Sequence, residues 1–224
     1  MGNIERHKRK PFKKSFLKSV QLLLTFNKIE LDENLGNEIK QHLVDSSFKI
    51  TETGELPMIQ AQRNTAALTF YEKGLMLSTD KNDYGSFEDF YKIINNVVVP
   101  LLEKAGINIL TTSILLKNNS YRVNKATAET EPTKDRILND LFSPLLLNSE
   151  LSSYGNIEND SLFTSQYKFI NREADIIVEL IISAMSLQEQ PVDMFLNGLP
   201  EINERIYDYW YESVTDKVRN LMEA

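Results

Sequence analysis

The residues able to bind metal or transfer protons are few and scattered in this chain of 224 residues. There is no cysteine, and the two histidines, His7 and His42, do not lie at ligand spacing from each other or from a carboxylate. Close acid pairs could hold Mg²⁺ through carboxylate oxygens alone, namely Asp80 with Asp83 and Glu173 with Asp175. Such pairs are frequent among 32 acidic residues, so we interpret them as solvated surface.

Motifs for phosphate binding and nucleophilic catalysis are absent from the sequence. The eight glycines are scattered and form no phosphate-binding loop, and no Gly-x-Ser-x-Gly turn occurs. Glu38-Ile39-Lys40 has the Glu-x-Lys spacing of some nucleases, but it lies in a predicted helix rather than on a strand. We therefore assign no catalytic residue, no metal ligand and no cofactor.

The first 18 residues form a basic arm on an acidic chain. They hold seven basic residues and one acidic residue, Glu5, whereas the whole chain has a net charge of −7. Such an arm can bind nucleic acid, an anionic membrane or an acidic partner copy, or it can be a solvated terminus. The candidate nucleic-acid-binding residues are Arg6, Lys8, Arg9, Lys10, Lys13 and Lys14, with Arg122 at a predicted strand end.

Aromatic residues gather near the end of the chain. Tyr207, Trp210 and Tyr211 could stack on nucleobases, but their helical spacing favours packing in a core or a protein interface. We name these three as candidate interface residues. They belong to the clearest amphipathic helix, over residues 199–222, where Pro200 fits the first turn.

The first half of the chain shows a strand, a helix, a hairpin and a long helix. Residues 19–27 alternate as a strand, and Asp32 caps a helix that ends near Asp45. Pro57 predicts that the residues after it are loop or edge strand. Residues 64–79 form a hairpin in which Gly74 supplies a positive φ at the turn. The long helix begins at Ser86, and Pro100 predicts a kink near Val97.

The second half repeats that order. A strand over residues 108–116, with a possible extension to Val123, precedes a polar, mobile stretch over residues 117–132. Thr133 caps a helix, and residues 148–160 have loop composition. A second hairpin follows over residues 161–185, and then the final helix.

Together these elements predict an α+β fold, an antiparallel sheet with long helices on one face. We expect a basic arm over residues 1–18 and one domain over residues 19–224. The repeated order allows two pseudo-repeat halves, 19–106 and 107–224, although no residue-level repeat is found. No apolar run is long enough to span a membrane and no signal peptide is evident, so we expect a cytoplasmic protein.

Four segments carry a resemblance to a known family. They are Lys10-Pro11-Phe12 before the first strand, Gly74-Leu75-Met76-Leu77 with Tyr84 and the helix from Phe87, Tyr121-Arg122-Val123-Asn124, and the stretch Tyr209-Trp210-Tyr211-Glu212-Ser213-Val214-Thr215-Asp216-Lys217. The last resembles the closing aromatic-x-x-Ser-Ile/Val-Thr-Asp pattern of a sporadically distributed family of uncharacterised bacterial and archaeal proteins. The resemblance implies an α+β fold of this length and no settled activity, and the family's patchy distribution suggests mobile or defence-linked genes.

Three hypotheses for function follow, in order of preference. The first is a non-catalytic binding protein that works with another protein or with itself in a prokaryotic complex, for example an antiviral one. The second is a nucleic-acid-binding protein that uses the basic arm and the loop over residues 117–134. The third is a Mg²⁺-dependent enzyme that uses Asp80 and Asp83.

Overall fold

The computed structural model describes residues 5–7, 16–51, 58–80, 86–127, 133–147, 153–158 and 160–223. The chain divides into two compact units. Unit 1 draws on Met1–Lys18, Leu116–Ala184 and Glu201–Ala224, and unit 2 on Ser19–Leu115 and Met185–Pro200. Antiparallel strands and helices make up both units, which confirms the α+β class. The predicted domain boundaries stay predictions.

The sheet of unit 2 is antiparallel, with strand order β2-β3-β4-β5-β1. The strands are β1 (Leu17–Thr25), β2 (Lys49–Thr51), β3 (Met58–Arg63), β4 (Ala66–Tyr71) and β5 (Gly74–Asp80). Alternate residues of β1, β4 and β5 face the core, where Leu22, Phe70 and Leu77 are fully buried. This alternation is the strand pattern that the sequence predicted for β1 and the hairpin.

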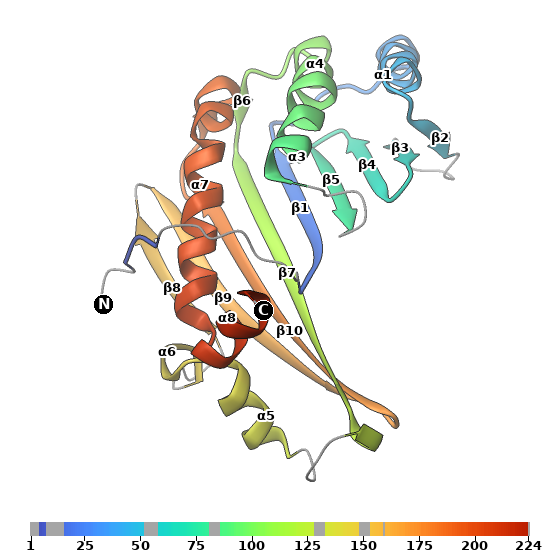
Figure 1. Cartoon of the computed structure of the whole chain (residues 1–224). Coiled ribbons are helices and arrows are strands. Elements are labelled where there is room, and N and C mark those ends of the chain that lie inside the picture. Colours follow the sequence, from blue (N-terminus) through green and yellow to red (C-terminus); the bar gives the residue numbers. More distant parts are fainter. Residues whose placement is uncertain are drawn as a thin grey trace. The chain divides into compact units, whose positions relative to one another are not determined.

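The helices of unit 2 lie on one face of these strands (Figure 1). They are α1 (Glu33–Asp45), α3 (Phe87–Ile93), the π-helical turn η1 (Ile94–Val98), α4 (Val99–Lys104) and the first turns of α7 (Val192–Ser213). Asp32 and Ser86 cap α1 and α3 as predicted, since their side-chain oxygens accept from Leu35 N–H and Asp89 N–H. A small second sheet pairs β6 (Ile109–Leu110) with β11 (Gln190–Pro191).

Pro100 distorts the long helix as the sequence predicted. The five residues before Val99 form the wide π-helical turn, in which Val99 N–H donates to the carbonyl of Ile94. A proline cannot donate to the carbonyl four residues earlier, and its ring crowds that carbonyl. The wider turn gives the ring room, so the helix continues past Pro100 rather than ending there.

Two expectations were wrong, one about strand β5 and one about strand β3. Gly74 does not have a positive φ, and it is the first residue of β5 rather than a turn residue. Glycine is required there for space, because the Tyr71 ring lies over it. The residues after Pro57 were expected to be loop or edge, but β3 starts at Met58 and lies between β2 and β4.

The final helix differs from the prediction at both of its ends. Helix α7 begins at Val192, so Pro200 lies inside it rather than in its first turn. A proline at position 200 leaves the carbonyl of Leu196 without its usual helical donor. The hydroxyl of Tyr91 donates to that carbonyl at 3.2 Å. A side chain far away in the sequence therefore compensates for the proline.

This compensation makes a prediction for Tyr91→Phe. Loss of the hydroxyl should lower the free energy of unfolding by about 1 kcal/mol, because the Leu196 carbonyl loses its donor. In a Pro200→Ala background the alanine N–H can take that role, so the same change should cost much less. Urea unfolding of the four proteins in this double-mutant cycle measures the coupling. Equal losses in both backgrounds would show that Tyr91 does not compensate for Pro200.

Unit 1 contains the strand order β7-β10-β9-β8. The strands are β7 (Thr112–Asn124), β8 (Ser153–Glu158), β9 (Ser161–Asn171) and β10 (Asp175–Ser186), and β9 and β10 form the predicted second hairpin. The helices are η2 (Lys125–Thr127), α5 (Lys134–Leu141), α6 (Pro144–Leu147), the second part of α7, and α8 (Asp216–Glu223). Helix α7 lies over the strands (Figure 1). Tyr209 of α7 stacks on Phe163 of β9 with 5.1 Å between ring centroids.

Two segments of polar composition are strands, the first at the strand extension that the sequence left open and the second where a loop was predicted. Residues 117–124 complete β7, where Lys117 donates to Asn203 of α7 and Trp210 donates to the Tyr121 hydroxyl. Residues 153–158 form β8, whose Glu158 pairs with Arg205. Their polar composition resembles that of loops, but Lys117, Tyr121 and Glu158 have partners on α7.

The closing Ser213-Val214-Thr215-Asp216 segment interrupts the predicted final helix and separates α7 from α8. Ser143 N–H donates to the carbonyl of Ser213, and Thr215 N–H donates to the carbonyl of Leu141. The Thr215 hydroxyl also donates to the Asp140 carbonyl at 2.7 Å. The segment therefore attaches α5 to the end of α7, which is a structural role for this motif.

Candidate functional site

The most deeply buried charges of unit 1 form one network around Arg205 of α7. Its guanidinium donates to both carboxylate oxygens of Glu158 on β8, with Nε–Oε2 at 2.8 Å, and to Asp208 Oδ2 at 2.7 Å. The side chains of Arg205 and Asp208 are only 7% and 2% exposed. Burial acts to lower the pKa of Arg205, but the hydrogen bonds to the two carboxylates outweigh it and raise that pKa.

The network leaves little capacity for acid–base chemistry. Asp208 Oδ1 accepts from His7 N–H at 2.8 Å, and Glu158 Oε1 also accepts from the Tyr209 hydroxyl at 3.1 Å. A general base needs a lone pair directed at substrate, whereas these carboxylate oxygens already accept protein hydrogen bonds. The arrangement joins β8 to α7, so its role is structural.

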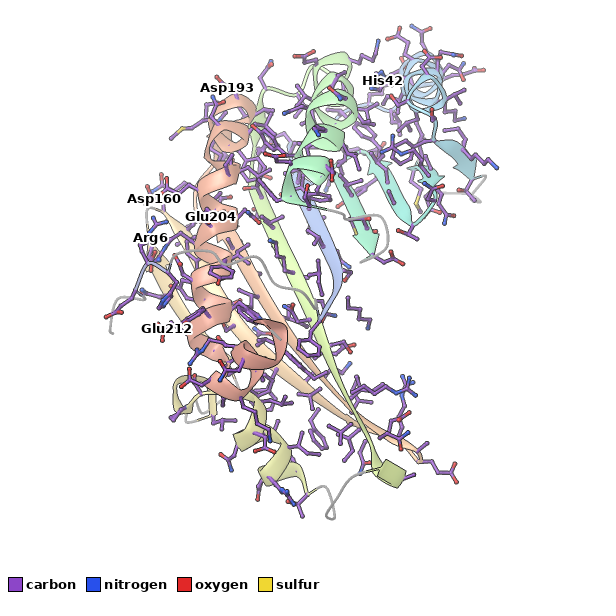
Figure 2. All side chains as sticks on the ribbon, viewed as in Figure 1. Arg6, His42, Asp160, Asp193, Glu204 and Glu212 are labelled. Carbon is purple, nitrogen blue, oxygen red and sulfur yellow. The ribbon has the colours of Figure 1, made fainter. Side chains whose placement is uncertain are left out.

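The described part of the basic arm lies on α7. Arg6 pairs with Glu201 at 2.9 Å, and His7 contacts Glu212 at 2.5 Å while its ring stacks on Tyr211. Figure 2 shows Arg6 and Glu212 on the same side of the helix. Arg6 therefore contacts carboxylates of its own unit. The other predicted residues of the arm, Lys8, Arg9, Lys10, Lys13 and Lys14, lie outside the described residues.

The remaining predicted binding residues belong to β7 and α7 of unit 1. Arg122 pairs with Asp175, whose pKa is lowered by the hydrogen bond from that guanidinium. Tyr207 and Trp210 are buried and stack on each other. Tyr211 is half-buried, and the guanidinium of Arg219 lies 4.4 Å from its ring centroid.

Metal binding finds no support among the residues that the structure describes. Within them no three His, Asp or Glu side chains gather as metal ligands would. His42 contacts the Val97 carbonyl, and Asp80 accepts from the Thr65 hydroxyl at 2.8 Å. Asp83 lies outside the described residues. No described helix is long and apolar enough to cross a membrane.

The face of the unit 2 sheet that lies opposite the helices has a central region without charged side chains. Strands β3, β4, β5 and β1 turn their core residues to the helices and their other residues to this face. Strand register groups twelve of these other residues into three rows, which are Gln60-Thr69-Met76-Leu23, Gln62-Ala67-Ser78-Gln21 and Met58-Tyr71-Gly74-Thr25. Beyond these rows on the same face, Ser19 of β1 pairs with Asp80, the last residue of β5. None of the twelve is charged, although a quarter of the chain is. We call these twelve residues the charge-free face.

The charge-free face differs from the corresponding face of unit 1. There, Lys18 pairs with Glu179 at 2.5 Å across the strands, and this hydrogen bond lowers the pKa of Glu179. Arg122 and Asp175 form a second pair. Depletion of charge marks the buried centres of protein interfaces. The charge-free face thus has the charge depletion of an interface, and Met76 in its middle row is 36% exposed.

The uncharged residues of this face are visible in the sequence, but strand register was needed to show that they lie side by side. Every second residue of Gln21–Thr25 and of Ala67–Tyr71 is uncharged in the sequence. Only the pairing of β3 with β4 and of β5 with β1 places these residues side by side. Since β3 was expected to be loop or edge, the three rows could not be assembled.

Comparisons with known proteins assign no family to the chain. No protein-family model matches it, and no curated protein sequence matches it. Among solved structures it is similar to the regulatory subunit of aspartate kinase from Thermus thermophilus, in the ligand-free form, with 12% identity and a TM-score of 0.21 over 74% of this chain and 83% of that chain. The subunit from Thermus flavus gives 13% identity and a TM-score of 0.22 over 88% and 94%. These similarities are too low to indicate a function.

Proposed function

We propose that this protein is a non-catalytic binding protein that recognises another protein surface through the charge-free face. The observation that carries the proposal is the set of three uncharged rows on four adjacent strands. The exposed face of an antiparallel sheet is normally polar and solvated. A face without any charge loses little hydration when a partner covers it, because no ion has to be desolvated.

The charged groups of unit 1 favour the same function. Arg205, Glu158 and Asp208 pair with one another, as do Arg122 with Asp175 and Lys18 with Glu179. Paired charges stabilise a fold and are poorly available for substrate. The resemblance of the closing segment supports a place in a prokaryotic complex, with antiviral defence as the context that the resemblance suggests.

The proposal is tested by photo-crosslinking from the charge-free face. A photoreactive phenylalanine analogue replaces Met76 in the full chain, expressed in the cells that naturally make the protein. We expect a crosslinked protein adduct, because Met76 lies in the middle row of the face. The change Thr69→Lys next to Met76 should reduce the adduct at least about tenfold, since it buries a charge in the interface.

A further inference from the structure

We infer that the partner of the charge-free face is a second copy of this chain, with the two faces packed against each other. This inference rests on the proposed function, since it names the partner for the same face. It follows from three properties of the face, which are its hydrogen-bonding chemistry, the charge that surrounds it and its size.

The polar side chains of the face are self-complementary. The amides of Gln21, Gln60 and Gln62 and the hydroxyls of Thr69 and Ser78 each carry a donor and an acceptor. A face of lysines has only donors and a face of aspartates only acceptors, so neither can pair with an identical copy. Leu23 and Met76 add apolar area between the polar residues. An identical face can therefore satisfy this one.

The net charge of the chain restricts how two copies can meet. At a net charge of −7, two copies repel each other through their acidic surfaces. The repulsion between charges farther apart than about 8 Å is largely screened at physiological salt. Contact through the twelve uncharged residues keeps the nearest charges at the border of the face, where Lys49 pairs in register with Gln62 and Asp80 follows Ser78 on β5. Self-association through this face therefore brings few like charges together.

The size of the face predicts a reversible dimer. Four strands about 4.8 Å apart and three rows about 6.8 Å apart give a flat footprint of about 400 Å² per copy. Stable complexes bury about 800 Å² per partner, and smaller interfaces are typical of transient association. We therefore expect a dissociation constant in the micromolar range, of about 1 to 100 μM.

The test is the molar mass of the full chain by sedimentation equilibrium, from about 1 to about 300 μM, a range that brackets the expected dissociation constant. The wild-type mass should rise from one copy towards two. Thr69→Lys and Met76→Lys should each remain at one copy, because like charges would meet in the interface. A mixture of Thr69→Lys with Thr69→Glu should regain the two-copy mass. Gln166→Lys, on an exposed position of β9 in unit 1, is the matched control and should behave as wild type.

Each contrary result has a separate meaning. A wild-type chain that stays at one copy over the whole range overturns the inference of a second copy. If Met76 still crosslinks a different protein, the proposed function survives that result. A two-copy mass that both lysine variants retain while folded would show that the dimer uses another surface, and it would overturn the assignment of this face. Circular dichroism of each variant identifies any that fails to fold, and the wild-type dilution series decides the inference even then.

Discussion

Arg205→Met should lower the free energy of unfolding by about 3 kcal/mol. The substitution leaves the Asp208 carboxylate, which is 2% exposed, and the Glu158 carboxylate without their cationic partner. Removing one member of a buried ion pair is costly because the other charge stays buried and uncompensated. Urea unfolding followed by far-UV circular dichroism measures the change. The urea concentration at the midpoint of unfolding should fall, while the slope of the unfolding free energy against urea concentration should stay the same.

The matched control is Arg122→Met. Arg122 also pairs with a carboxylate, that of Asp175, but its side chain is 70% exposed. Exposed ion pairs contribute less than about 1 kcal/mol, so this variant should unfold close to the wild-type midpoint. Equal losses in the two arginine variants would mean that burial does not set the strength of the Arg205 network. The triple change of Arg205, Glu158 and Asp208 to apolar residues should recover part of the stability.

Gly74→Ala should destabilise the protein by about 2 kcal/mol. A β-carbon at residue 74 would lie 2.5 Å from the Tyr71 hydroxyl oxygen and 2.8 Å from the backbone oxygen of Leu24. The Tyr71 ring can move, but the backbone of β1 is held by its pairing with β5. The additional change Tyr71→Ala should therefore not restore wild-type stability.

Gly198→Ala provides the control for glycine replacement. Nothing lies within 4 Å of a β-carbon built at Gly198, which is in the interior of α7. Alanine there should stabilise the helix by up to about 1 kcal/mol, since it loses less backbone entropy than glycine. Thermal unfolding of both variants tests the pair. A Gly74→Ala protein as stable as Gly198→Ala would show that β5 can move away from Tyr71.

Local signals in the sequence predicted much of the secondary structure. Asp32, Ser86 and Thr133 cap their helices because capping requires only a side-chain oxygen near the N–H groups that follow it. The alternation of Ile176, Val178 and Leu180 likewise identified β10. These features depend on residues a few positions apart, so the sequence alone is sufficient for them.

Features that depend on distant residues could not be predicted in this way. The sequence of β8 has loop composition. Its Glu158 pairs with Arg205, which lies 47 residues later, and this distant partner could not be seen in the local sequence. Helix α7 continues through Pro200 because Tyr91 donates to the carbonyl of Leu196, 105 residues away. The charge-free face could be recognised only from the register of four strands. Each of these errors came from a partner that no local pattern identifies.

Photo-crosslinking from Met76 is the direct test of whether the charge-free face binds protein. The same photoreactive residue at Gln166, on the charged face of unit 1, is the positional control. We predict an adduct from Met76 that exceeds the adduct from Gln166 by at least about tenfold, as expected for a buried position against an exposed one. Equal adducts from the two positions, or no adduct from Met76 while Gln166 reacts, would contradict the claim.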